Sequence, residues 1–405
     1  MTPPAFWVLC SAAFATAFGY GAIMPVLPAV LERVGLDASQ DASSWHAGAL
    51  GGLYMLAIVV CAPLWGVLSD RFGRRNIIAA GLAGSALAFV LSAAATSLVV
   101  AYAARGLAGA FAAAVLPVAA AATAGIMEEK ERARKFAGLS ATILLGYFVG
   151  PAVTAWLATM PEMLSGPVAG SQYASAAITL LALAAVAFVP DRPVDVPAEV
   201  RERRETPHRL PIHLLLLNFT ALLGIGMFEV ALPLGARGTL QLDAAAVSLL
   251  FVECSALMIV AQGVLLVVHD RERLRHLLTA GFVCYGAGLL LLAGTVPMLS
   301  PFLAVGFVAA GSGIVLPVIG YLAALEAGQA AGATFGTLVA AGSLGQAAGS
   351  FAGGAGYANL GIQIFTAAAL AMGLGAVLGA RYRPLSSRVG VQSRPQERRT
   401  AEIND

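Results

Sequence analysis

Long apolar runs alternate with short polar stretches along the whole of this 405-residue chain. A helix needs about 20 apolar residues to cross the hydrocarbon core of a bilayer, and runs of about that length occur twelve times. The pattern therefore predicts an all-α polytopic membrane protein with twelve transmembrane helices. We place the spans at residues 7–31, 46–69, 76–95, 98–126, 136–158, 170–189, 212–235, 244–268, 277–295, 299–325, 331–355 and 358–380.

Composition agrees with this prediction and excludes several classes of protein. The chain is 59% hydrophobic and only 11% charged, too few charges to cover the surface of a soluble domain. Its basic residues are spread over many short loops, which argues against a nucleic-acid partner. No nucleophile–base or metal-ligand spacing occurs, so we expect no enzyme activity, cofactor or metal site. All four cysteines lie in apolar runs: Cys10, Cys61, Cys254 and Cys284.

The distribution of Lys and Arg predicts the orientation. Of 24 basic residues, Arg33 and Arg237 fall on one side, Arg105 lies within a span, and the other 21 fall on the opposite side. The positive-inside rule places that side, with both termini, in the cytoplasm. The first apolar run follows no basic segment and is too long for a signal-peptide core, so we expect an uncleaved first helix.

The spans divide into two groups that resemble each other. We predict an N-terminal six-helix bundle over 1–190, a cytoplasmic linker over 191–211, a C-terminal bundle over 212–380 and a disordered cytoplasmic tail over 381–405. Two matches relate the bundles at the same offset of 200 residues. The dipeptide Asp-Arg at 70–71 recurs at 270–271, and Val-Leu-Pro-Val at 115–118 recurs at 315–318. This predicts a duplicated, pseudo-symmetric unit with a central cavity.

A dense cluster of charge follows the second apolar run at residues 66–76, where residues 66–75 read G-x-x-x-D-R-x-G-R-R. Gly66 allows a neighbouring helix to approach, Asp70 can cap a helix N-terminus, and Gly73 permits a tight turn. The arginines can hold the loop at the cytoplasmic surface and pair with carboxylates: Arg71, Arg74 and Arg75. A basic loop of any polytopic protein is the alternative. The full pattern resembles the loop between helices 2 and 3 of the major facilitator superfamily, which implies a gating role.

Three charged residues lie inside spans, where charge is costly and commonly faces a cavity or a partner. Arg105, Glu229 and Glu253 each lie about 9–14 Å from the outer boundary, at about 1.5 Å per residue. We expect a proton-coupling site in which one carboxylate pairs with Arg105 and the other carries the proton, with Glu229 as the first choice. The alternatives are an arginine that snorkels to the surface and glutamates satisfied by structural partners. The arginine and the glycine four residues on are similar to the superfamily's fourth-span motif.

The fifth span contains Gly146, Gly150 and Pro151 in the pattern G-x-x-x-G-P. Small residues four apart allow helices to pack closely, and proline kinks a helix, so helix packing alone would explain the pattern. In this span the pattern also resembles the antiporter motif of drug/proton exporters. The chain departs from that motif at Thr154 and Ala155, where the family often has glycines.

The first span also resembles that of drug exporters, and its glycines and prolines allow bending. It has no carboxylate at its middle, so proton handling must rest on the second half. The eleventh span is rich in glycine, and we expect it to pack against the second span near Asp70. Aromatic residues that could line the cavity are Phe14, Phe18, Tyr20, Phe228 and Tyr321.

The chain is thus identified as a member of the major facilitator superfamily, similar to bacterial twelve-span drug/proton antiporters. The resemblance implies alternating access, a bacterial inner membrane, and export of a small organic molecule in exchange for protons. Its substrate would be a drug, a secreted metabolite or a siderophore. A proton symporter that imports a metabolite is one alternative, and a membrane sensor or scaffold without transport activity is another. We expect a monomer.

Overall fold

The computed structural model describes residues 3–36, 41–124, 129–160, 166–187, 210–263, 271–294, 301–327 and 331–382. These residues are helical almost throughout and include twelve α-helices of 18 residues or more. The first six are α1 Pro3–Ile23, α3 Asp41–Phe72, α4 Arg74–Ala93, α5 Leu98–Ala124, α6 Glu129–Ala158 and α7 Gly166–Ala187. The other six are α9 Ile212–Gly238, α10 Ala244–Gln262, α11 Arg271–Leu292, α12 Pro301–Ala327, α13 Ala331–Leu360 and α14 Ile364–Arg381.

Eleven segments are long and apolar enough to cross a membrane, which confirms a multi-pass, all-α membrane protein. The last of them, Gly336–Arg381, has 46 residues and would measure about 69 Å as one helix. It comprises α13 and α14, joined by a 3-10 turn at Gly361–Gln363, and so provides two crossings. Most of the predicted linker and nearly all of the predicted tail lie outside the described residues.

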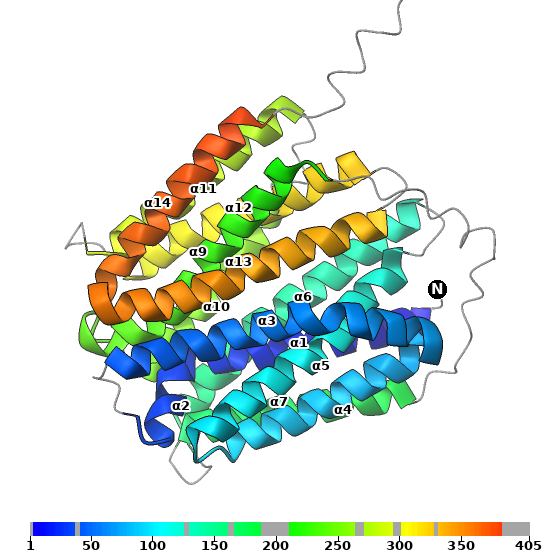
Figure 1. Ribbon diagram of the computed structural model, residues 1–405, viewed down its shortest axis with the longest axis horizontal. Coiled ribbons are helices and arrows are strands. Elements are labelled where there is room, and N and C mark those ends of the chain that lie inside the picture. The colour runs from blue at the N-terminus through cyan, green and yellow to red at the C-terminus, as the bar shows by residue number, and fades with distance from the viewer. Residues whose placement is uncertain are drawn as a thin grey trace, which may run out of the picture.

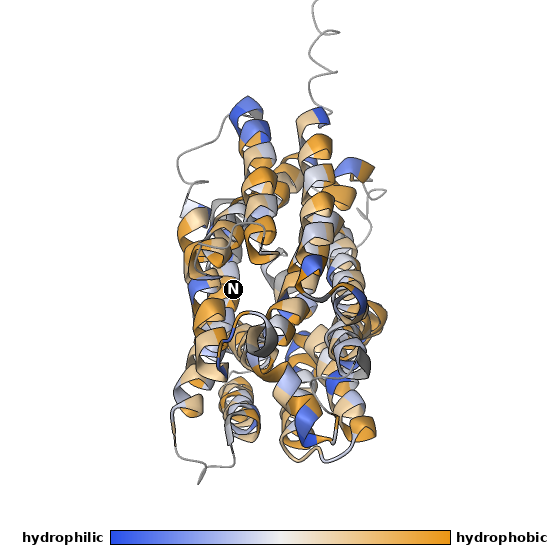
Figure 2. Ribbon diagram, turned by 90° about the vertical axis from the view of Figure 1, so that its left-hand side faces the viewer, coloured by the Kyte–Doolittle hydropathy of each residue, from blue (hydrophilic) through white to orange (hydrophobic). Residues whose placement is uncertain are grey.

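The helices form two groups, which we call the N-half (α1 to α7) and the C-half (α9 to α14). Figure 1 shows α3 and α13 running across the middle, with α4, α5 and α7 of the N-half below them and α9, α11, α12 and α14 of the C-half above them. The halves also meet where α6 packs against α10. Figure 2 shows that apolar residues predominate along the helices, as a lipid environment requires.

The two halves repeat a helix contact at the offset found in the sequence. A Cβ built at Gly81 of α4 would lie 2.9 Å from the Val115 side chain of α5. A Cβ built at Gly281 of α11 would lie 2.8 Å from the Val315 side chain of α12. The glycines are 200 residues apart, as are the valines. The same close approach of neighbouring helices is therefore built twice.

The bundle has two distinct ends. At the end that we call the Pro25 end, α1 stops at Ile23 and continues through a 3-10 turn, Met24–Val26, into the short helix α2, Leu27–Arg33. At the opposite end, which we call the Gly73 end, α3 passes into α4 through Gly73 with φ at +84°. Glycine adopts that conformation without the strain of a Cβ, so the predicted tight turn is formed.

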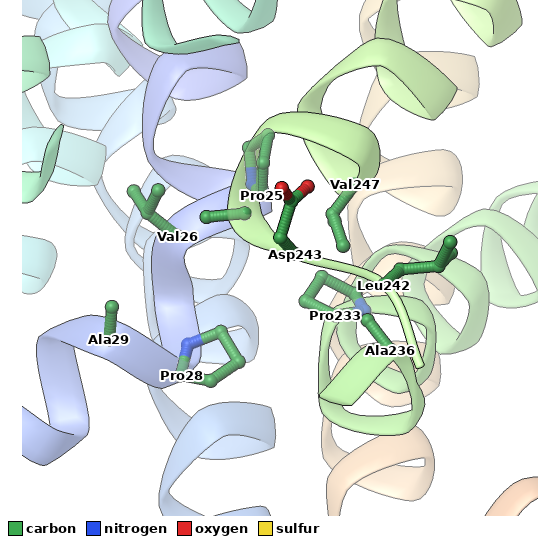
Figure 3. Close-up of a pocket in the computed structure, with 10 residues that line it drawn as sticks. Pro25, Val26, Pro28, Ala29, Pro233, Ala236, Leu242, Asp243 and Val247 are labelled. Atoms are coloured by element: carbon green, nitrogen blue, oxygen red, sulfur yellow. The ribbon is translucent and has the colours of Figure 1, made fainter. Parts of the chain in front are cut away.

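The halves are packed together at the Pro25 end. A Cβ at Gly48 of α3 would lie 2.6 Å from the carbonyl oxygen of Ser350 in α13, so the two backbones nearly touch. Figure 3 shows a small pocket where the chain around Pro25 faces α9 and the start of α10. The Asp243 carboxylate begins α10 there by accepting from the Ala246 amide at 2.7 Å.

Among the residues that the structure describes, no comparably close approach is seen between α3 and α13 at their other ends. Open space surrounds a Cβ built at Gly66 of α3 or at Gly336 of α13. The close helix approach expected at Gly66 is therefore not made in this conformation. The described halves meet at the Pro25 end and part toward the Gly73 end.

Candidate functional site

A network of polar side chains joins the halves near the middle of the bundle. The Tyr20 hydroxyl of α1 donates to Oε2 of Glu229 in α9 at 2.6 Å. The Gln346 amide of α13 donates to the same carboxylate oxygen at 2.8 Å and to the Tyr20 oxygen at 3.0 Å. One carboxylate oxygen thus accepts two hydrogen bonds, one of them from the opposite half. Tyr20 and Gln346 are buried, whereas Glu229 is partly buried.

Arg105 of α5 lies on the N-half side of this network and is only 3% exposed. Its guanidinium lies over the Tyr54 ring, 4.8 Å from the centroid, and over the Tyr20 ring at 5.7 Å. Its Nε donates to the carbonyl oxygen of Leu50 at 3.3 Å, and its buried Nη2 has no hydrogen-bond partner among the described residues. Arg105 is therefore a buried cation held by aromatic faces and one carbonyl, rather than a residue that snorkels to the surface.

The sequence predicted a carboxylate paired directly with Arg105, and the structure differs. Glu229 makes its hydrogen bonds to Tyr20 and Gln346, and the Tyr20 side chain contacts both charged groups. An aromatic hydroxyl can serve both because its ring face attracts the cation while its O–H donates to the anion.

Glu253 does not join this network in the structure. Its Oε1 lies 3.6 Å from a Cβ built at Gly306, which places the side chain along the seam between α10 and α12. Its Oε2 is buried and has no hydrogen-bond partner among the described residues. Of the three charged residues that we expected to share one site, the structure brings Arg105 and Glu229 together through Tyr20 and leaves Glu253 apart. A shared depth does not fix which way a side chain points.

The fifth-span glycines position Tyr20 by bringing α6 against α1. A Cβ at Gly146 would lie 2.7 Å from the Phe14 carbonyl oxygen, and one at Gly150 would lie 2.6 Å from that of Phe18. Thr154, where the resemblance led us to look for glycine, donates to the Ala22 carbonyl oxygen at 2.9 Å. The departure from the family pattern therefore adds a bond between the same two helices.

Pro151 leaves one backbone carbonyl of α6 without its helical hydrogen bond, and a side chain of the C-half donates to that carbonyl. Proline has no amide hydrogen, so the carbonyl of Tyr147, four residues earlier, loses its helical donor. The Ser255 hydroxyl of α10 lies 3.2 Å from that carbonyl oxygen and 2.9 Å from the carbonyl oxygen of Phe251 in its own helix. This is a second polar contact between the halves, at the kink that the motif creates.

The residues of the charged loop lie at the Gly73 end. Asp70 is exposed in the last turn of α3, and the Arg71 guanidinium lies 5.3 Å from the centroid of the Phe72 ring. Nε of Arg75 donates to the carbonyl oxygen of Val186 at 3.2 Å, which ties the start of α4 to the end of α7. Arg74 begins α4 beside it and is half-buried.

The predicted cavity aromatics fall into two groups. Phe18, Tyr20 and Phe228 are each at most 2% exposed, so in this conformation they contact protein. Phe14 and Tyr321 are partly exposed. Sequence reasoning missed Gln346, Tyr54 and Tyr147 as residues of this site.

The glycines of α13 pack differently from the expectation. Those at 342, 345, 349 and 353 face α9, where added Cβ atoms would meet Asn218, Phe219, Leu223 and Met227. Among the described glycines of α13, Gly354 is the one that packs against α3, at Ser44 and Gly48. The row at 342, 345, 349 and 353, which we call the glycine ridge, therefore packs α13 against α9 within the C-half. The contact between α13 and α3 lies at the Pro25 end.

Two halves of six helices, which meet around a buried cation and a partly buried acid, define a secondary transporter of a membrane. A family model of the Major Facilitator Superfamily matches residues 9–212 and 214–405, and the chain belongs to that superfamily, whose members are transporters and not enzymes.

Solved structures share this fold across nearly the whole chain. A human organic anion transporter, TETRAN, is 20% identical with a TM-score of 0.71, covering 94% of this chain and 100% of that one. The partially occluded, inward-open xylose transporter XylE of E. coli is 14% identical with a TM-score of 0.77, covering 95% and 100%. At these identities the likeness concerns the fold alone.

Curated relatives match over a shorter stretch. The class C tetracycline resistance protein of Escherichia coli is 35% identical over 135 residues, which cover 33% of each chain. Multidrug resistance protein 2 of Bacillus subtilis is 26% identical over 153 residues, which cover 38% of this chain and 37% of the relative. The aligned segments thus span about a third of the relatives' length.

Proposed function

We propose that this transporter exports a small organic molecule in exchange for protons, by alternating access across a bacterial inner membrane. In this proposal both termini and the Gly73 end lie in the cytoplasm, so the structure represents a state open to the inside. The local similarity to tetracycline and multidrug resistance proteins supports export. The fifth-span glycines and proline support exchange rather than symport.

The observation that carries the proposal is the hydrogen bond from Tyr20 to Glu229 across the two halves. A hydrogen bond to an ionised acceptor contributes about 1.5–3 kcal/mol, and one between neutral groups contributes about 1 kcal/mol. This difference is smaller than the cost, several kcal/mol, of taking a bare carboxylate out of water, so protonation of Glu229 favours the closed Pro25 end. The empty carrier therefore returns to the inward-open state most readily with a proton on Glu229, and this couples the return step to proton entry.

Substrate and proton then act on the same contact in turn. A substrate that enters from the cytoplasm and interacts with Arg105 or Glu229 offsets the lost bond, and the Pro25 end opens. A proton from outside neutralises Glu229 after the substrate leaves, and the halves return. An inward proton gains about 2.3 kcal/mol per 100 mV of membrane potential, which drives the cycle.

The experiment is transport by the purified protein in liposomes with an imposed pH gradient. Glu229→Gln keeps an amide that can accept from Tyr20 but cannot exchange a proton. We expect it to bind substrate and to catalyse counterflow but to lose uphill, gradient-driven export. Substrate-dependent proton flux that persists in Glu229→Gln would rule out this carrier.

Glu253→Gln is the matched control on the neighbouring helix. It should keep coupled export, because Glu253 lies on the α10–α12 seam away from Tyr20. If coupling is instead lost only in Glu253→Gln, the proton role moves to α10. Proton and substrate moving in the same direction would favour the symporter alternative, and no transport of any organic substrate would favour a sensor or scaffold.

A further inference from the structure

A groove opens between α4 and α7 at the Gly73 end, away from the seam between the halves. Its volume is about 430 Å³, within the range of small-molecule sites. Arg75 and Asn76 line it at the start of α4, and the rest of the lining is apolar: Ala79, Leu180, Leu183, Ala184 and Val186.

The groove joins a polar part to an apolar part at a membrane boundary. α4 has 20 residues and is about 30 Å long, the thickness of a hydrocarbon core, so Arg75 in its first turn lies at the headgroup level. Leu180 is 51% exposed, and Ala184 one turn further is exposed too. In a membrane these side chains contact acyl chains, because no helix of the described residues covers them.

The charge at the polar part is positive. Arg71 and Arg74 stand within four residues of Arg75, and the described residues that line the groove include no acid. Nε of Arg75 donates to the Val186 carbonyl oxygen, and this hydrogen bond holds the guanidinium at the rim of the groove. Basic pockets between transmembrane helices are suited to anionic lipid headgroups.

We propose that this groove binds one anionic phospholipid. The phosphate lies against Arg75 and Asn76, and one acyl chain lies along Leu180 and Leu183. A zwitterionic lipid would fit the apolar part equally, but it would bring a second cation to a cationic rim. The bound lipid would hold the start of α4 against the end of α7, beside the charged loop.

The test is native mass spectrometry of the purified, delipidated protein, titrated with phosphatidylglycerol or phosphatidylcholine. We expect one phosphatidylglycerol to bind at least about tenfold more tightly than phosphatidylcholine, as a charge-assisted hydrogen bond implies. Ala184→Trp fills the groove and should remove that preferred molecule. Leu181→Trp is the matched control, because Leu181 is 71% exposed on the same helix but does not line the groove.

A second pair of variants tests the rim, in case Ala184→Trp folds poorly. Arg75→Gln should reduce the preference for phosphatidylglycerol about tenfold. Arg381→Gln, an exposed arginine at the end of α14, should leave it unchanged. Equal binding of the two lipids, or a preference that survives both Ala184→Trp and Arg75→Gln, would overturn the proposal. So would a groove that binds neither lipid because another segment of the chain fills it.

Discussion

At the scale of single residues, the site depends on how a buried cation is kept without a direct counter-ion. Arg105 rests on two tyrosine faces and one carbonyl oxygen, and Tyr20 links it to the acid on the opposite half. A change at Tyr20 would therefore affect the cation and the acid together, and single substitutions in this network will not be additive.

The first residue-scale prediction concerns Arg105. Arg105→Ala removes a cation–π contact and a charged hydrogen bond, and should destabilise the N-half by about 2 kcal/mol and abolish transport. Arg105→Lys should restore little activity, because lysine lacks the planar guanidinium. That group can stack on an aromatic ring and donate a hydrogen bond in its own plane at the same time. Thermal unfolding and liposome transport measure the two effects. Wild-type activity in both variants would show that the buried guanidinium has no part in transport.

Charge was the property that allowed site residues to be predicted from the sequence. Arg105 and Glu229 stand out because charge inside an apolar run is rare and costly. Gln346 and Ser255 do not, because single neutral polar residues are common in spans. These helices are also apolar on nearly every face, so periodicity does not say which side chains face one another. The same ambiguity led to the grouping of Glu253 with Arg105 and Glu229.

At the scale of elements, the kink in α6 connects the motif to the movement of the halves. Ser255 has one hydroxyl hydrogen and two carbonyl oxygens within reach, one in each half. When the halves separate, the hydroxyl keeps its bond to Phe251, and water can reach the Tyr147 carbonyl. The contact therefore stabilises the closed Pro25 end without holding it permanently.

We predict that Ser255→Ala shifts the protein toward opening at the Pro25 end. Loss of one neutral hydrogen bond of about 1 kcal/mol would raise the open population about fivefold. The measurement is the reaction rate of an introduced Ala29→Cys with an impermeant maleimide, in a background without the native cysteines. Ser248→Ala is the control, because that hydroxyl bonds only within α10, to Ala244. Equal rates in the two variants would contradict the role of Ser255.

The loop between α3 and α4 gives a second prediction at this scale. Asp70 is exposed at the end of α3, so Asp70→Asn should leave the amount of folded protein in the membrane nearly unchanged. It should nevertheless abolish transport, because a carboxylate at the parted end can stabilise the opposite conformation through a helix N-terminus or an arginine. Membrane abundance and liposome transport are measured together. Transport at the wild-type rate would remove the gating role from Asp70.

At the scale of the whole molecule, the sequence predicted the number of helices, their order and the repeat, because bilayer thickness and a duplicated pattern leave few alternatives. It could not predict which conformation the halves adopt. That depends on small contacts between halves, such as those at Gly48 and Ser255, which differ little in free energy from contacts with water or lipid.

The contact at Gly48 allows a test of the whole-molecule arrangement. Gly48→Val places a side chain against the Gly354 and Ser350 backbone, so the Pro25 end can no longer close. We expect the Ala29→Cys position to react severalfold faster and transport to stop. Gly373→Ala is the control, because its added methyl group meets open space. Unchanged reactivity in Gly48→Val would mean that the halves do not separate along α3 and α13.

The glycine ridge of α13 indicates which helix contacts persist during transport and which ones break. Because residues 345, 349 and 353 press against the backbone of α9, those two helices must travel as one body. A disulfide introduced between α9 and α13 should therefore be harmless to a working transporter. One introduced between positions 48 and 354 should arrest it, and reduction should restart it. Chemical cross-linking could in this way trace the boundary of each moving body, one helix pair at a time.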